Sequence, residues 1–440
     1  MKKLALAVTC LVVGGVAGLA AASTVLSAPP VFTAEQPMNP VSESDWEPYV
    51  ATDPLQPVVY ISARNENSAQ QTMVKRSANG GSTFTAVTPL PMAGGKWQAD
   101  QVMKVDTSGK VYVVWLTQSG GANNWYLFFS TSTNGGTSWS TPVRPDVNDT
   151  LAWADKPWMT ISPDGTHVYI GYYGSTKAKG GTPKAFIVTS VNGGNTFGVP
   201  QRVNTNDGRY WFAESAQADN AGNAYFAFSR ETTAGTAGSD LYLVRSANGG
   251  GTWTTTLVDS STQGPACNVA SPPCLTDNYN GQIVVALDPA GRLMVAYTKN
   301  AAAGARKVLY TKTSIDHGVT WTSPVSVTAD RAGDQGFQQI AAGQASNDFR
   351  VLWSDDRNGA SRYNTYFSRT SDGGVTWTSE VLLSNVGTYP GAAYKTATGY
   401  HFPFGDYAGL AVTSTGANVA IWGEGENRDT VGGSWYAVGN

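Results

Sequence analysis

Short runs of alternating apolar and polar residues, separated by turns, recur along most of the chain. The clearest example is Val102–Trp115, where two alternating runs flank the turn Asp106–Lys110 in the pattern of an antiparallel hairpin. Equivalent hairpins begin near seven positions: Glu47, Asp100, Asp155, Glu214, Asn280, Gln338 and Asp406. The pattern predicts an all-β protein built from repeated hairpins.

A second repeat follows most of these hairpins. It has Ser or Thr first, Asn or Asp two residues later, then glycine and a closing aromatic residue, as in Ser77–Phe84. The six copies begin at Ser77, Ser132, Ser190, Ser246, Ser314 and Thr370. Their starts are 55, 58, 56, 68 and 56 residues apart, which is the length of a four-stranded propeller blade. Because Asn or Asp accepts turn amides, glycine permits positive φ and the aromatic ring fills the space between sheets, we interpret these residues as structural.

The hairpins outnumber the repeated turns by one, which bears on the blade count. The last hairpin, Gly405–Trp422, is followed by a single further strand, Gly433–Val438. The segment Val31–Met38 could supply the missing strand and close the ring with the C-terminus. A chain of about 412 residues after a leader gives about 59 residues per blade for seven blades and about 69 for six. The observed spacing favours a β-propeller of seven four-stranded antiparallel blades over residues 29–440, with six as the alternative.

The N-terminus has the layout of a secretory signal peptide: Lys2 and Lys3 precede an uncharged apolar stretch, Leu4–Ala22. We expect residues 1–28 to be removed and the protein to be secreted, periplasmic or at the cell surface. An uncleaved membrane anchor is the alternative. No second hydrophobic segment of spanning length follows.

An exported protein reaches an oxidising compartment, in which neighbouring cysteines form disulfides. Cys267 and Cys274 lie close together in a Pro-rich segment, and we expect them to form a local disulfide; a two-Cys metal site is the alternative. We expect no cofactor and no catalytic metal.

The composition of the chain limits the classes of molecule that it is expected to bind. The chain of 440 residues is 41% hydrophobic and 14% charged, with 29 basic and 32 acidic residues and no basic run interleaved with aromatics. This excludes a disordered protein and argues against nucleic acid as a partner. We expect a monomer that binds a glycan or polysaccharide.

Candidate site residues gather where the predicted inner strands begin, since these strands line the channel of a propeller. A carboxylate lies at or next to each start: Glu47, Asp100, Asp155, Glu214, Asp277, Asp334 and Asp406. Trp97 and Trp211 could stack on sugars, and Arg64, Arg230 and Arg357 could bind an anionic group. Alternatively, the carboxylates accept backbone amides between blades, the tryptophans pack between blades and the arginines form surface ion pairs.

The six repeated turns resemble the Asp-box (BNR repeat) of the sialidase (neuraminidase) superfamily, over about Glu47 to Glu424. Glu214–Gln217, followed by Arg230, resembles the sialidase segment that carries the acidic partner of the nucleophile and an arginine of the carboxylate-binding triad. Tyr407–Leu410 is similar to the segment that carries the nucleophilic tyrosine. The resemblance implies that Tyr407 attacks the sugar and that Glu214 assists it, since a phenol with pKa near ~10 needs a base at neutral pH.

Other segments match the sialidase pattern less well. Arg362 stands roughly where another triad arginine is expected, with Arg357 as its competitor. The first inner strand has Glu47 where sialidases have an arginine, and the loop that should carry the acid/base aspartate offers only Glu66. The proton donor would therefore be Glu66 or Asp100.

Together these features predict a secreted sialidase-like glycoside hydrolase with an atypical active site. The alternative is a non-catalytic propeller that binds glycans or cell-envelope polymers, which needs no proton donor. A lyase or another polysaccharide hydrolase, with His401 as base, is a further alternative.

Overall fold

The computed structural model describes residues 28–40, 45–65, 71–95, 97–118, 125–147, 153–175, 183–205, 209–233, 237–262, 282–328, 333–358, 364–384, 395–396, 399–400, 407–424 and 433–440. All regular structure in these residues is β, and they contain no helix that could cross a bilayer. The predicted leader up to residue 27, and Cys267 and Cys274, lie outside the described residues.

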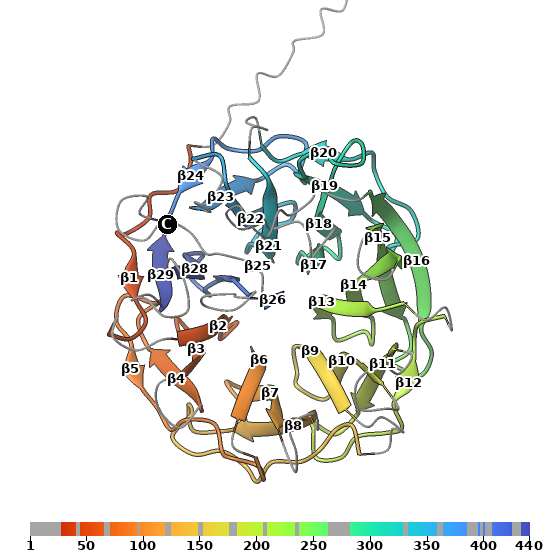
Figure 1. Ribbon diagram of the computed structural model, residues 1–440. Helices are drawn as coiled ribbons and strands as arrows, with labels where there is room; N and C mark the ends of the chain where they lie inside the picture. Colours follow the sequence, from red (N-terminus) through yellow and green to blue (C-terminus); the bar gives the residue numbers. More distant parts are fainter. Residues whose placement is uncertain are drawn as a thin grey trace, which may run out of the picture.

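Seven antiparallel sheets are arranged in a ring around a common centre, the channel (Figure 1). In six of them the chain runs from the centre outward; in the seventh, β27 to β29 do so, and the outermost strand comes from the N-terminal segment. The strands nearest the channel, here called inner strands, are β2 (Asp45–Thr52), β6 (Trp97–Val105), β9 (Trp153–Ile161), β13 (Trp211–Ala218), β17 (Ile283–Leu287), β21 (Gln335–Ala342) and β27 (Gly409–Val412). The second strands are β3 (Val59–Asn65), β7 (Val111–Gln118), β10 (Val168–Ser175), β14 (Ala224–Thr233), β18 (Leu293–Lys299), β22 (Phe349–Asp355) and β28 (Asn418–Glu424).

The outer half of each blade is built from a long third strand and a short fourth one. The third strands are β4 (Thr72–Ser77), β8 (Trp125–Ser132), β11 (Pro183–Ser190), β15 (Ala237–Ser246), β19 (Val308–Ser314), β23 (Asn364–Thr370) and β29 (Gly433–Gly439). The fourth strands are β5 (Thr85–Ala86), β12 (Gln201–Arg202), β16 (Thr254–Ser261), β20 (Val325–Ser326), β24 (Val381–Leu382) and β1 (Gln36–Pro37). In blade two, Val143 pairs with Phe129 of β8 in the fourth-strand position. A separate short hairpin, β25 (Lys395–Thr396) and β26 (Gly399–Tyr400), lies between blades six and seven along the chain.

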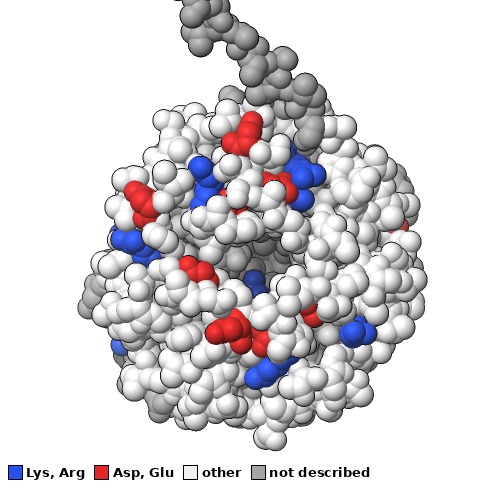
Figure 2. Space-filling view, turned by 180° about the vertical axis from the view of Figure 1, so that it is seen from behind, with Lys and Arg blue, Asp and Glu red and all other residues white. Residues whose placement is uncertain are grey.

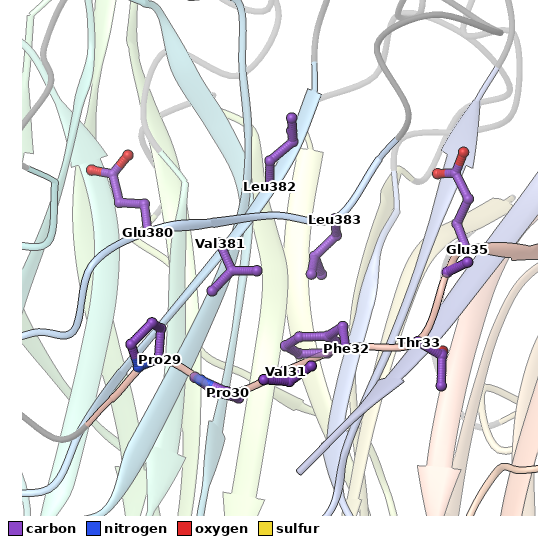
Figure 3. A pocket seen from close by; sticks show the side chains of 11 residues that line it. Pro29, Pro30, Val31, Phe32, Thr33, Glu35, Glu380, Val381, Leu382 and Leu383 are labelled. Carbon is purple, nitrogen blue, oxygen red and sulfur yellow. The ribbon is translucent and has the colours of Figure 1, made fainter.

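The seventh blade closes the ring with both ends of the chain, which confirms the predicted blade count and closure. N-terminal β1 pairs with C-terminal β29, with Gln36 opposite Tyr436. Phe32 pairs with Gly439 and packs edge-to-face on Phe367 of blade six at 4.9 Å. The segment before β1 runs beside β24 and borders a groove of about 570 Å³ (Figure 3). The third strand of blade seven ends at the C-terminus, so this blade has no repeated turn, and hairpins outnumber turns by one.

The six repeated turns share one hydrogen-bond pattern. In the first, the Ser77 hydroxyl accepts the Gly81 N–H at 2.9 Å, and Asn79 Oδ1 accepts the Thr83 N–H at 3.0 Å. The bond to the first residue of the turn recurs at 2.8–3.0 Å in the other five copies. Gly81 has φ +94°, and a Cβ there would lie 2.9 Å from Val438 of blade seven. The turn therefore needs glycine both for its backbone and for close packing against the preceding blade.

The aromatic residue that ends each repeated turn packs on the preceding blade. Phe84 meets Tyr436 of blade seven at 5.0 Å, and Phe197 meets Phe129 of blade two at 5.2 Å. These rings join hydrophobic clusters that run between neighbouring sheets. The repeated turns thus have a structural role in the described residues. The candidate functional site is therefore sought in the channel.

Candidate functional site

Five inner strands carry a β-bulge near their start, where one strand has extra residues relative to its neighbour. The bulged residues include Glu47 in β2, Asp100 in β6, Lys156 in β9, Glu214 in β13 and Phe337 in β21. All of these except Glu214 have positive φ, between 48° and 58°. Since bulges re-aim side chains and are common next to active sites, this end of the channel, here called the bulge mouth, is the candidate site.

Several side chains at the bulge mouth connect neighbouring blades. The Glu47 carboxylate accepts the Asp100 N–H at 2.7 Å, and the Glu214 carboxylate accepts the Ile283 N–H at 2.6 Å. Gln282 accepts the Phe337 N–H in the same way, at 2.7 Å. Two of these amides, of Asp100 and Phe337, belong to bulged residues, and all three bonds join neighbouring blades, so Glu47 and Glu214 help to hold the ring together.

Lys156 lies close to several of the candidate catalytic residues. Its Nζ lies 3.9 Å from Asp100 Oδ1 and 4.6 Å from the centre of the Tyr407 ring. Its charge also acts on the partly buried carboxylates of Asp155 and Glu214, where it opposes the rise in pKa that desolvation causes. Lys156 thus joins Tyr407, Glu214 and Asp100, three residues predicted from the sequence, in one electrostatic cluster.

Glu214 has a raised pKa in this cluster. Burial raises its pKa from 4.5 to about 8, against hydrogen bonds from the Ser229 hydroxyl and the Ile283 N–H and the charges of Lys156 and Lys307. Tyr407 precedes β27, and its ring lies 6.3 Å from that of Trp158 at an angle of 32°. The cluster therefore combines a phenol, a cation and a carboxyl group that titrates near neutral pH.

A second carboxyl group lies beside Asp100. Burial and the negative charge of Asp100 raise the pKa of Asp155, which accepts hydrogen bonds from the Tyr173 hydroxyl at 2.9 Å and from the Lys156 N–H at 2.8 Å. Asp334 accepts the Lys307 N–H at 2.8 Å and connects blades as Glu47 does. Asp277 and Asp406 lie outside the described residues.

The predicted arginines have partners outside the Lys156 cluster. Arg230 pairs with Asp240 at 2.7 Å within blade four. Arg357 pairs with Asp355 at 2.6 Å and also with Glu380, and lies over the Tyr366 ring in blade six. Arg64 is buried between blades one and two, with its guanidinium 4.0 Å from the centre of the Trp97 ring. The three arginines thus belong to different blades and each has a local partner.

The predicted aromatic residues are also involved in packing. Trp211 is buried and stacks on Tyr242 at 4.6 Å, so that side of its indole is covered. Trp97 contacts Arg64 and packs edge-to-face on Trp125 at 5.4 Å. Glu66, Arg362 and His401 lie outside the described residues. Among the described residues, no group of three or more His, Cys, Asp or Glu side chains is placed to hold a metal ion.

Sequence reasoning missed Lys156, the centre of the cluster. The adjacent Asp155 was predicted instead, because it belongs to the series of carboxylates at the starts of the predicted inner strands. A usable signal was present: a charged residue followed by proline interrupts the alternation at Glu47-Pro48 and again at Lys156-Pro157. Both pairs lie at bulges, where a residue without a ladder partner tolerates the missing N–H of proline.

Comparison with known proteins agrees with this fold. A Hadza microbial sialidase, Hz136, superposes with a TM-score of 0.51 at 15% identity, over 86% of this chain and 76% of that protein. An ulvan lyase of polysaccharide lyase family PL25 superposes with a TM-score of 0.51 at 12% identity, over 93% of this chain and 94% of that protein. No protein-family model and no curated protein sequence matches the chain. The chain therefore has a β-propeller fold, here with seven blades, and it shares the propeller fold with a sialidase and with a polysaccharide lyase.

Proposed function

We propose that the protein is a secreted sialidase-like glycoside hydrolase acting on glycans, with an atypical active site at the bulge mouth. The observation that carries this proposal is the position of Lys156, which places Tyr407, Glu214 and Asp100 around one cation. Its secretion rests on the signal-peptide pattern of residues 1–28 and is tested by N-terminal sequencing of the exported protein.

In this mechanism Tyr407 is the nucleophile. A cation near a phenol favours the phenolate, and Lys156 Nζ lies 4.6 Å from the ring centre. Glu214 accepts the phenolic proton; its pKa of about 8 is close to the working pH, which suits a general base. The Tyr407 oxygen then bonds to the anomeric carbon as the glycosidic C–O bond breaks.

The leaving oxygen needs a proton donor on the other side of the sugar. Asp100 is the candidate among the described residues because of its position: its carboxylate lies 3.9 Å from Lys156 Nζ, in the same cluster as Tyr407. Glu66, predicted from the sequence, is the other candidate. Water then attacks the anomeric carbon, releases Tyr407 and regenerates the donor.

The test is hydrolysis of a panel of 4-methylumbelliferyl glycosides, including the sialic acid conjugate, by the purified protein. We expect turnover of at least one glycoside and its loss in Tyr407→Phe. Tyr310→Phe in β19 is the matched control and should retain turnover. Turnover that survives Tyr407→Phe would refute the assignment of the nucleophile.

A second candidate function is glycan binding without catalysis. It is favoured by the carboxylates of Glu47 and Glu214, which accept amides of the next blade, and by the carboxylate partners of Arg230 and Arg357. Binding to a glycan array by a folded protein that hydrolyses no member of the panel would support this function instead.

A further inference from the structure

The opposite end of the channel contains a second cavity. It has a volume of about 620 Å³ and is lined by residues of all seven inner strands or the turns that follow them. We call this end the hairpin mouth, because the hairpins between inner and second strands turn here. Seen from behind, the molecule is hollowed at its centre, and basic atoms are visible inside the hollow (Figure 2). The volume lies within the usual range of small-molecule sites.

Lys104 of β6 is the one cation that lines this cavity in the described part of the chain. Burial lowers its pKa from 10.5 to about 8, and no charged neighbour opposes that effect. None of the described carboxylates forms an ion pair with it. Lys104 is partly buried, and a partly desolvated ammonium group without a counter-ion is unfavourable, so a ligand that supplies negative charge would gain from binding here.

The carboxylates that line the cavity are already satisfied by the hairpin turns. Asp219 accepts the N–H groups of Ala221 and Asn223, at 2.8 and 2.9 Å, and the side-chain amide of Asn223 at 2.7 Å. Asp288 likewise accepts three backbone N–H groups at 2.8–2.9 Å. These turn contacts orient both carboxylates toward backbone amides, and neither carboxylate forms an ion pair with Lys104 or contributes to its pKa.

Other lining groups can complete the binding of an anion. The Tyr49 hydroxyl and the Gln339 amide line the cavity, and neither has a hydrogen-bond partner among the described residues. Gln217 Nε2 donates to the Val285 carbonyl at 3.3 Å, so its own oxygen can accept from a ligand hydroxyl. Tyr49 packs edge-to-face on Trp158 at 5.9 Å, which gives the cavity an aromatic wall. A cation, uncommitted donors and an aromatic wall suit a small polar anion.

We propose that the cavity at the hairpin mouth binds a small oxyanion group, a carboxylate, sulfate or phosphate, through Lys104. The ligand is either the free anion or a molecule of about monosaccharide size that carries it. The cavity shares Trp158 with the surroundings of Tyr407, but the proposed anion binding uses Lys104 and does not depend on the proposed hydrolase activity.

The test is isothermal titration calorimetry of the full mature protein with sodium sulfate, sodium phosphate and sodium glucuronate at constant ionic strength. We expect at least one to bind, and Lys104→Met to weaken that binding by about ten- to a hundredfold, the value of a charge-assisted hydrogen bond. Lys110→Met in the neighbouring hairpin turn is the matched control and should leave binding unchanged. Preference for glucuronate indicates a sugar-borne anion, and preference for sulfate or phosphate indicates a free one.

A second readout is independent of affinity. After reductive methylation with ¹³C-formaldehyde, the NMR titration of Lys104, assigned by its loss in Lys104→Met, should shift to higher pH when the bound anion is present. Absence of binding by all three probes, or equal binding by Lys104→Met, would overturn the proposal.

Discussion

The two mouths of the channel are built from the same inner strands, but each contains a lysine in a different electrostatic environment. At the bulge mouth, Lys156 lies among the carboxylates of Asp100, Asp155 and Glu214. At the hairpin mouth, Lys104 faces a cavity whose carboxylates are satisfied by turn amides. A bulge shifts the alternation of side chains by one residue, so one strand can present different residue classes at its two ends. The bulges in the inner strands, rather than the number of blades, therefore determine which charged residues face each mouth of the channel.

Trp158 lies between the two regions. It lines the cavity of the hairpin mouth, where it packs on Tyr49, and its ring also lies beside Tyr407 at the bulge mouth. The wall of one site therefore supports the proposed nucleophile of the other.

The largest expected effect comes from removing the cation at the bulge mouth. Lys156→Met should lower the free energy of unfolding by about 2–3 kcal/mol, because it leaves the buried carboxylate of Asp100 and the partly buried carboxylates of Asp155 and Glu214 without their counter-charge. Lys156→Arg, which keeps the charge at the same positive φ, is the control and should lose less. The measurement is urea unfolding at pH 7; equal midpoints for the wild type and Lys156→Met would contradict the electrostatic cluster.

A slightly smaller effect is expected from the link between blades one and two. Glu47→Ala leaves the Asp100 N–H without its acceptor and should cost about 1–2 kcal/mol. Glu47→Gln keeps an acceptor oxygen and should cost less than half of that. Thermal unfolding of the two variants measures the difference, and equal losses would mean that the hydrogen bond is not the source.

The next prediction concerns the pH dependence of stability. Because the pKa of Glu214 is raised on folding, the folded state binds more protons than the unfolded state between pH about 4.5 and about 8. This carboxyl group therefore stabilises the fold fully below pH about 4.5, and the contribution is lost as pH rises toward 8. Glu214→Gln should flatten the profile in that window by about 1 kcal/mol, allowing for solvent screening. If Glu214→Gln leaves the slope of stability against pH unchanged, the raised pKa does not belong to Glu214.

The smallest expected effect has the opposite sign and sharpens the contrast between the mouths. Lys104→Met should raise the free energy of unfolding in anion-free buffer, by about 0.5–1 kcal/mol, because it removes a partly desolvated charge that has no counter-ion. Differential scanning calorimetry beside Lys156→Met checks the sign. Destabilisation of both variants would show that the two lysines have the same role.

The sequence predicted the frame of the molecule better than its site. Repeated turns fix the blade length by themselves, and the surplus hairpin Gly405–Trp422 correctly indicated closure by the N-terminal segment. The turns are local structures, so a single sequence reveals them. Which side chains meet across the channel depends on bulges in five separate strands, and short-range pattern does not place those.

Individual residues illustrate that limit. Glu214 and Tyr407 were predicted from a family resemblance, yet the cation that joins them, Lys156, was not. Arg357 matched an expected position, but its charge is shared with Asp355 and Glu380 within its own blade. Residue type and strand position were visible in the sequence, whereas partners from other blades depend on the closed ring.

The most direct test of the proposed active site is mass spectrometry of the protein quenched during turnover of its best substrate. The account predicts a glycosyl adduct on the peptide that contains Tyr407, absent from Tyr407→Phe, because the phenol forms the covalent intermediate. Steady hydrolysis with no adduct, or an adduct on another residue, would contradict it.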